Sequence, residues 1–185
     1  DRIVVGAWEQ KDFQVMRSIY RRFVDAPDVQ YIEVNPKEAA AGKLLANFIL
    51  FNKLAVCFDV VGRVSELFSN IQYEQLRKIL ASDVRIGSWG LYDSLYAGGS
   101  CFIKDARSLA FQLRTQGVEP TLVDQVYLSN KRQLERFLNR IVDATGQQVN
   151  GKIVALLGTA FKRDTNDVRN SSSIDIARFL VTQGV

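Results

Sequence analysis

A cysteine in a glycine-rich turn is the residue of this sequence best placed to do chemistry. Cys101 follows Gly98, Gly99 and Ser100, and a helical pattern runs from it to about Gln116. Two glycines allow a tight turn and a close approach of a ligand. A thiol at such a turn meets the partial positive charge of the helix N-terminus, which favours a nucleophilic cysteine. The alternative is a small buried hydrophobic side chain, which is the more frequent role of a lone cysteine.

Four further residues have the types and spacing that such a nucleophile needs. Lys104 and Asp105 lie within four residues of the thiol, where an ammonium could stabilise a thiolate and a carboxylate could move a proton. Lys43 and Asn47 are one helical turn apart in an earlier stretch and share a face. That face is directed either into a pocket or to solvent, and the spacing alone favours solvent.

A basic loop near the end of the sequence is a candidate phosphate site. Lys162, Arg163 and Arg169 precede a predicted helix over 172–183, and helix N-termini attract anions. A solvated surface loop is an equally good interpretation of these residues. The chain has no histidine, which excludes Ser-His and Cys-His mechanisms within it. Its second cysteine, Cys57, lies in an apolar helical run, and neither a disulfide framework nor a metal site is expected.

The elements that must position these residues are mainly helical. Asn35, Pro36 and Glu38 form a strong helix start with a capping box. The long helix that follows is apolar on most sides, so its second face is expected to meet another subunit. The sequence predicts strands over 2–7, 29–34 and 152–158, of which the first and last are buried, and helices over 12–24, 35–69, 73–81, 101–116, 121–144 and 172–183.

Composition and charge narrow the class of protein. The 185 residues include 24 Lys and Arg against 20 Asp and Glu, a net charge of +4 that is spread along the chain. Such a distribution suits an anionic small molecule and lacks the basic block of a nucleic-acid arm. We find no signal peptide and no apolar run of about 18 residues, so we expect a soluble cytoplasmic protein without membrane contact. The ends look cut, and we expect a natural chain to extend in both directions.

Three motifs, in matching order and spacing, resemble those of the UDP-glucose/GDP-mannose dehydrogenase family. The stretch 98–105, Gly-Gly-Ser-Cys-Phe-Ile-Lys-Asp, resembles its active-site motif. The stretch 43–47, Lys-Leu-Leu-Ala-Asn, resembles its lysine and asparagine on the long central helix. The stretch 161–172 resembles the segment that opens its nucleotide-sugar domain.

The resemblance implies a mainly α fold with three parts. Residues 1–34 would be the tail of an N-terminal NAD-binding Rossmann domain. Residues 35–148 would be a helical central dimerisation domain, similar to the C-terminal domain of 6-phosphogluconate dehydrogenase. Residues 149–185 would begin a C-terminal nucleotide-sugar domain, so that partial Rossmann-like α/β pieces stand at both ends. The G-x-G-x-x-G fingerprint of NAD binding is not in this sequence, so the fragment alone is expected to be inactive.

The resemblance also implies an activity, a cofactor and roles for individual residues. The family oxidises a sugar C6 alcohol to a carboxylate with two NAD, through a thiohemiacetal and a thioester on the cysteine. The implied reaction centre consists of Cys101, Lys43, Asn47 and Asp105. The implied nucleotide-sugar contacts are Arg85, which reaches across a homodimer, Tyr92, Gly98, Phe161 and Lys162. The implied NAD contacts are Lys104 and Arg169.

Several positions depart from the family pattern, and one helps to distinguish among the family's members. Tyr96 and Ala97 replace the usual glycine and aromatic residue, Ile103 replaces a proline, and Ala40 replaces an acidic residue. These changes affect the shape of the loop more than the implied chemistry. Arg85 and its spacing to the cysteine favour UDP-glucose as the substrate. GDP-mannose oxidation and a non-catalytic dimerisation module remain the alternatives.

Overall fold

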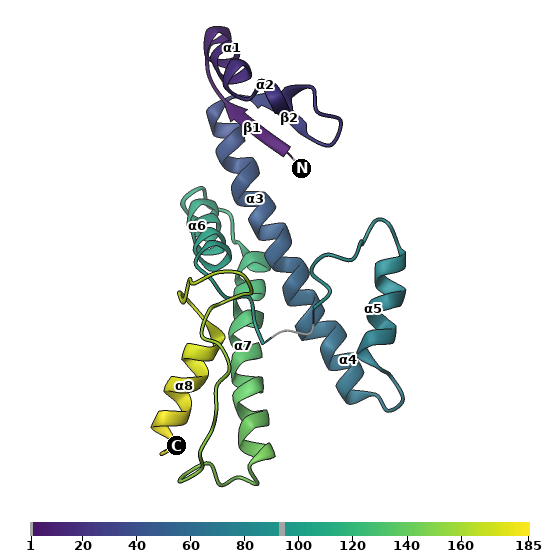
Figure 1. The fold of residues 1–185 in the computed structure, drawn as a ribbon, viewed down its shortest axis with the longest axis vertical. Helices are drawn as coiled ribbons and strands as arrows, with labels where there is room; N and C mark the ends of the chain where they lie inside the picture. Colours follow the sequence, from purple (N-terminus) through teal and green to yellow (C-terminus); the bar gives the residue numbers. More distant parts are fainter. Residues whose placement is uncertain (1, 93–94) are drawn as a thin grey trace. The chain divides into compact units, whose positions relative to one another are not determined.

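The chain forms two compact units that share one long helix. The computed structural model describes residues 2–92 and 95–185 and divides the chain into Asp1–Ala46 and Asn47–Val185 (Figure 1). The structure is mainly helical, as the sequence predicts, with one small parallel sheet in the first unit. The predicted domain boundaries at 34/35 and 148/149 remain a prediction.

The first unit is a small β-α-β arrangement. Strands β1 (Arg2–Gly6) and β2 (Gln30–Val34) pair in parallel, with Val4 opposite Ile32. Helices α1 (Gln10–Ile19) and α2 (Arg21–Val24) connect them, so the predicted helix over 12–24 is interrupted at residue 20. The prediction of a buried first strand is wrong, because only Val5 of β1 is buried. A parallel sheet needs cover on both faces, and the described part of this unit has too few elements to provide it.

The predicted capping box begins the long helix. The backbone N–H of Glu38 donates to Oδ1 of Asn35 at 2.9 Å, and the backbone N–H of Asn35 donates to Glu38 Oε2 at 3.0 Å. Helix α3 (Pro36–Ala55) continues through a π-helical segment, η1 (Val56–Val61), into α4 (Gly62–Leu67). The single long helix predicted over 35–69 is therefore confirmed, with the widened turn of η1 inside it.

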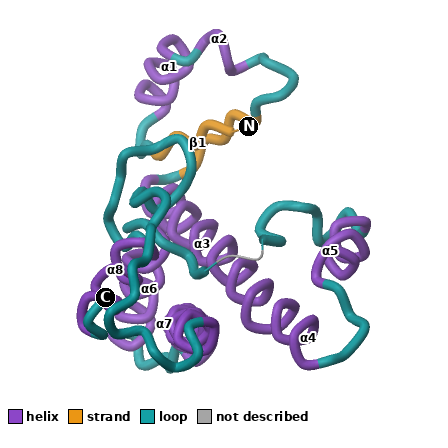
Figure 2. Tube along the Cα trace, turned by 60° about the horizontal axis from the view of Figure 1, so that its bottom comes forward, coloured by secondary structure: helices purple, strands orange, loops and turns teal. Residues whose placement is uncertain are grey.

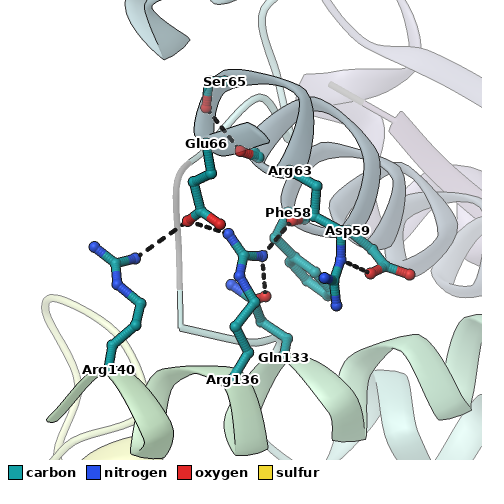
Figure 3. A network of polar contacts seen from close by, with 9 residues as sticks. Phe58, Asp59, Arg63, Ser65, Glu66, Gln133, Arg136 and Arg140 are labelled. Atoms are coloured by element: carbon teal, nitrogen blue, oxygen red, sulfur yellow. Dashed lines mark hydrogen bonds and ion pairs between the residues drawn. The ribbon is translucent and has the colours of Figure 1, made fainter. Parts of the chain in front are cut away.

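Side chains from another helix hold the π-helical segment in place. Arg136 of α7 (Thr121–Ala144) donates to the backbone carbonyl of Phe58 at 3.1 Å and forms an ion pair with Glu66 (Figure 3). The hydroxyl of Ser129, also in α7, donates to Asp59 at 2.8 Å. A π turn is rarely stable by itself. These contacts explain how this one is maintained.

The long helix is a core helix by its contacts. By length and composition, Pro36–Leu67 is apolar enough to cross a membrane, with a mean hydropathy of 1.8 in its best window, and this corrects the prediction that no such run exists. Phe51 and Phe58 are nevertheless fully buried, and Asn47 and Asp59 are hydrogen-bonded to neighbouring helices. We therefore assign it to the protein core.

The remaining helices of the second unit confirm the predicted pattern. Helix α5 (Tyr73–Ser82) follows α4, and α6 (Cys101–Thr115), α7 and α8 (Ser172–Thr182) gather on the opposite side of α4 from it (Figure 2). The main core lies where α6 and α7 meet the second half of α3 and η1. Its buried members are Phe51, Leu54, Ala55, Phe58, Ala97, Ala106, Ala110, Val123 and Val126.

The predicted buried strand over 152–158 is wrong. These residues have no regular secondary structure, and Ile153 and Leu157 are 100% and 95% exposed. A strand exists through hydrogen bonds to a neighbouring strand. Within the described residues the only strands are β1 and β2, which pair with each other. The segment is apolar enough for a strand, but no neighbouring strand in the described part of the chain pairs with it.

Candidate active site

Cys101 is the first residue of α6, as the sequence predicts, and it is exposed. The turn before it depends on both glycines. Gly99 has a φ of +80°, which strains any residue with a side chain. A Cβ on Gly99 would lie 2.8 Å from the ring of Phe161, and one on Gly98 would lie 2.6 Å from the carbonyl oxygen of Asn170. The glycines therefore let the 161–170 segment lie directly on the turn that carries the thiol.

Asp105, one turn after the cysteine, is a buried carboxylate that accepts hydrogen bonds from other side chains. It is 2% exposed. Nζ of Lys104 donates to its Oδ1 at 2.5 Å, and Nδ2 of Asn47 in α3 donates to its Oδ2 at 2.5 Å. The hydrogen bond from Lys104 to Asp105 and the carboxylate's charge raise the pKa of Lys104. Residues i and i+4 of a helix share a face, so this carboxylate lies on the side of α6 that begins with Cys101.

A second cation lies near the thiol from the other motif. Arg169 donates from Nη2 to Oδ2 of Asp167 at 2.7 Å and from Nε to Oδ1 at 3.0 Å. These bonds to Asp167 are the main reason why the pKa of Arg169 is raised, and the charge of Cys101 adds to the effect. Cys101 also contributes to the raised pKa of Lys104. Both cations are therefore within electrostatic reach of the cysteine.

The structure brings some predicted residues to this site and places others elsewhere. Phe161 lies on the turn, and Nζ of Lys162 is 5.5 Å from the centre of its ring. Arg85 forms an ion pair with Asp83, and its side chain is 87% exposed, so its predicted role across a dimer stays a prediction. Tyr92 is 49% exposed and packs edge-on against a tryptophan ring. Residues 93–94 of the same predicted binding stretch lie outside the described residues.

Lys43 requires separate mention because it belongs to the first unit. It lies one turn before Asn47 in α3, as predicted, and it is exposed. Its role at the reaction centre therefore stays a prediction. Within residues 2–92 and 95–185, no group of three His, Cys, Asp or Glu side chains could hold a metal ion.

Sequence reasoning missed the residues that support the turn. Asn130 of α7 is 4% exposed and uses both ends of its amide on the backbone of Ala97, at 2.8 and 3.2 Å. The hydroxyl of Tyr96 donates to Asp175 at 2.5 Å, which ties the turn to α8. An asparagine on the inward face of an amphipathic helix was the one signal that could have identified Asn130.

Comparison with known proteins decides the family. The sequence model of the UDP-glucose/GDP-mannose dehydrogenase family, central domain, matches residues 37–132. The chain belongs to this family. The matched residues include Lys43, Asn47, Cys101 and Asp105. The mainly helical fold of the chain is the one that the resemblance predicts.

Individual proteins that are similar to this chain support its assignment to the family. "UDP-glucose 6-dehydrogenase 4" of Arabidopsis thaliana is 34% identical over 190 residues, covering 98% of this chain and 38% of the relative. "UDP-glucose 6-dehydrogenase" of Pseudomonas aeruginosa is 29% identical over 185 residues, covering 100% and 40%. A solved UDP-glucose dehydrogenase from the archaeon Pyrobaculum islandicum is similar with a TM-score of 0.87 and 28% identity, covering 100% and 41%. The chain thus spans about two fifths of the length of these relatives.

Proposed function

We propose that this chain provides the reaction centre of an NAD-dependent nucleotide-sugar 6-dehydrogenase that converts UDP-glucose to UDP-glucuronate. One observation carries the proposal. Cys101 begins α6, and a buried carboxylate one turn later is held by Asn47 from another helix and by Lys104. A thiol and a proton acceptor on one helix, together with an amide from another helix, form the group that a covalent mechanism needs.

In the proposed reaction, the C6 alcohol first loses a hydride and its hydroxyl proton to give the aldehyde. Sγ of Cys101, as a thiolate, then adds to C6, and the carbonyl oxygen takes up a proton to give a thiohemiacetal. Loss of a second hydride from C6 and of the hydroxyl proton leaves a thioester. Water adds to the thioester carbon and loses a proton, the C–S bond breaks, and the products are the thiolate of Cys101 and a carboxylic acid that ionises to the carboxylate. Asp105 positions or deprotonates this water, and the side-chain amide of Asn47 holds the carboxylate of Asp105 in place. The ammonium of Lys43 stabilises the negative oxygen that develops at C6.

The cofactor in this proposal is NAD, which supplies the hydride acceptor when it is bound. Lys104 and Arg169 are the residues that would hold its diphosphate. Their side chains are 65% and 70% exposed and lie within electrostatic reach of Cys101. Each cation has N–H donors beyond those used by its carboxylate partner. The cationic pair therefore fits an anionic cofactor next to the thiol.

The nucleotide sugar would be held by the turn and by the segment that lies on it. Gly98, Phe161 and Lys162 are already adjacent there. Tyr92 would contact the sugar from the preceding loop. Arg85, whose guanidinium points to solvent beside Asp83, would reach the substrate of a partner subunit.

The proposed homodimer would form on the exposed apolar side of the long helix. Its exposed side chains Ile49, Val56, Val60 and Leu67 recur at spacings of seven and four residues, with exposed fractions between 47% and 76%. Such an apolar stripe is typical of a helix surface that another helix covers.

The test of the reaction centre uses this chain and the C6 aldehyde of UDP-glucose. The aldehyde should protect Cys101 from iodoacetamide by forming the thiohemiacetal, whereas UDP-glucose itself, which has an alcohol instead of an aldehyde at C6 of the sugar, should protect it less. Peptide mapping separates Cys101 from the buried Cys57, which serves as the internal control. Equal alkylation of Cys101 with and without the aldehyde would contradict the proposal. Stronger protection by the C6 aldehyde of GDP-mannose would indicate GDP-mannose as the substrate in place of UDP-glucose.

A further inference from the structure

Asn170 makes a two-way connection to the turn that carries the thiol. Its side-chain Nδ2 donates to the carbonyl oxygen of Gly99 at 3.0 Å, and its own carbonyl oxygen accepts the N–H of Gly99 at 3.3 Å. The hydroxyl of Tyr96 lies 3.3 Å from the same Asn170 oxygen. One residue thus binds both polar groups of Gly99, two positions before Cys101.

The backbone of Asn170 is in an unusual conformation that permits this contact. Its φ is 49°, a region that asparagine tolerates better than most residues with a side chain. The next residue, Ser171, is the N-cap of α8, and the residue before it is Arg169. Asn170 therefore connects the turn that precedes α6 with the start of α8 and with the arginine near the thiol.

The Gly99 peptide has little other support for its direction. It has a positive φ and lies just before α6, where Ser100 is the N-cap without a side-chain hydrogen bond. In most helices a capping side chain fixes this entrance. Here the fixation comes from a segment about seventy residues later in the chain, as the sequence separation of 71 indicates.

We propose that Asn170 is a positioning residue that clamps Gly99 and thereby keeps the thiol of Cys101 at the N-terminus of α6. This inference rests on the proposed function of Cys101 as the nucleophile. The amide is the suitable group because it offers an N–H to the Gly99 carbonyl. Aspartate has the same shape and tolerates the same φ, but a carboxylate would repel that carbonyl. Glycine tolerates the φ and removes the side chain.

The test compares Asn170→Gly and Asn170→Asp with Asn166→Gly and Asn166→Asp. Asn166 is an exposed asparagine of the same loop and serves as the matched control. The rate of iodoacetamide alkylation is measured separately for Cys101 and for buried Cys57 at one pH, without any sugar. If the clamp operates, Cys101 reacts about two- to five-fold more slowly in both Asn170 variants, because the thiolate loses the attraction of the helix N-terminus.

The second thiol separates a positioning effect from loss of structure. Partial unfolding would accelerate alkylation of Cys57, which is 1% exposed, whereas a positioning effect slows Cys101 alone. Unchanged Cys101 reactivity in the Asn170 variants, or equal slowing in the Asn166 variants, would overturn the proposal. Parallel acceleration of both thiols would do the same. Because no sugar is present, the result does not depend on whether the aldehyde protects Cys101.

Discussion

Replacing Asn47 by alanine tests the hydrogen bond that joins the long helix to the buried carboxylate of α6. Its Nδ2 donates at 2.5 Å to Asp105, a carboxylate that is only 2% exposed. A hydrogen bond to a charged group contributes about 1.5–3 kcal/mol, and the buried carboxylate has little water to replace it. Alanine favours the helix by roughly 0.6 kcal/mol over asparagine. The expected net loss of unfolding free energy is therefore about 1–2.5 kcal/mol.

The matched control is Asn52→Ala, one and a half turns later in α3. Asn52 is half-buried and has the same intrinsic helix preference, so this variant should be neutral or gain roughly 0.6 kcal/mol. Urea unfolding followed by circular dichroism measures both variants. With a slope of about 2 kcal/mol per molar urea, Asn47→Ala should lower the midpoint by roughly 0.5–1.2 M.

A double-mutant cycle with Asp105→Ala then isolates the pair. If Asn47 and Asp105 interact as described, the two losses should fall short of additivity by about 1.5–3 kcal/mol. Equal midpoints for Asn47→Ala and Asn52→Ala, or additive losses in the cycle, would refute the reasoning.

Three further predictions test the loop, the turn and the apolar stripe. The pKa of Asp167 is lowered to about 2 by hydrogen bonds from its arginine partner, so its stabilising effect is present above about pH 4 and lost as the pH falls towards 2. Asp167→Asn should flatten that part of a stability-against-pH curve, and an unchanged curve would contradict it. Gly99→Ala should destabilise more than Gly117→Ala, because both have a positive φ but only Gly99 faces an aromatic ring at 2.8 Å. Chemical denaturation measures the difference, and equal losses would argue against close packing. Val60→Glu should convert a dimer to a monomer in analytical ultracentrifugation, whereas Ile79→Glu on α5 should not. If the unsubstituted chain is itself a monomer at micromolar concentration, the proposed dimer on the apolar stripe is refuted.

The sequence was sufficient wherever the signal was local. The capping box of Asn35 and Glu38 formed as predicted, because its reciprocal hydrogen bonds involve residues three positions apart. Cys101 at the start of a helix followed from two glycines and a helical pattern. These features depend on a few adjacent residues and not on the rest of the fold.

The sequence was insufficient wherever a residue acts on a distant one. Asn170 binds Gly99 across 71 positions, and nothing in its local pattern indicates that partner. Asn47 was predicted to share a face with Lys43, but its contact with Asp105, 58 positions away, required the fold. The strand over 152–158 failed for the same reason, because apolar composition indicates a preference for strand but not the presence of a neighbour.

The widened turn of η1 has a consequence for how this helix tolerates change in length. A π turn holds one more residue than an α turn, so it accommodates an inserted residue without rotating everything after it. Arg136 and Ser129 hold this turn from the outside of the helix. The segments before and after η1 can therefore keep their own facing directions, and deletion of a single residue at Val60 should restore a regular helix while leaving the direction in which α4 faces unchanged.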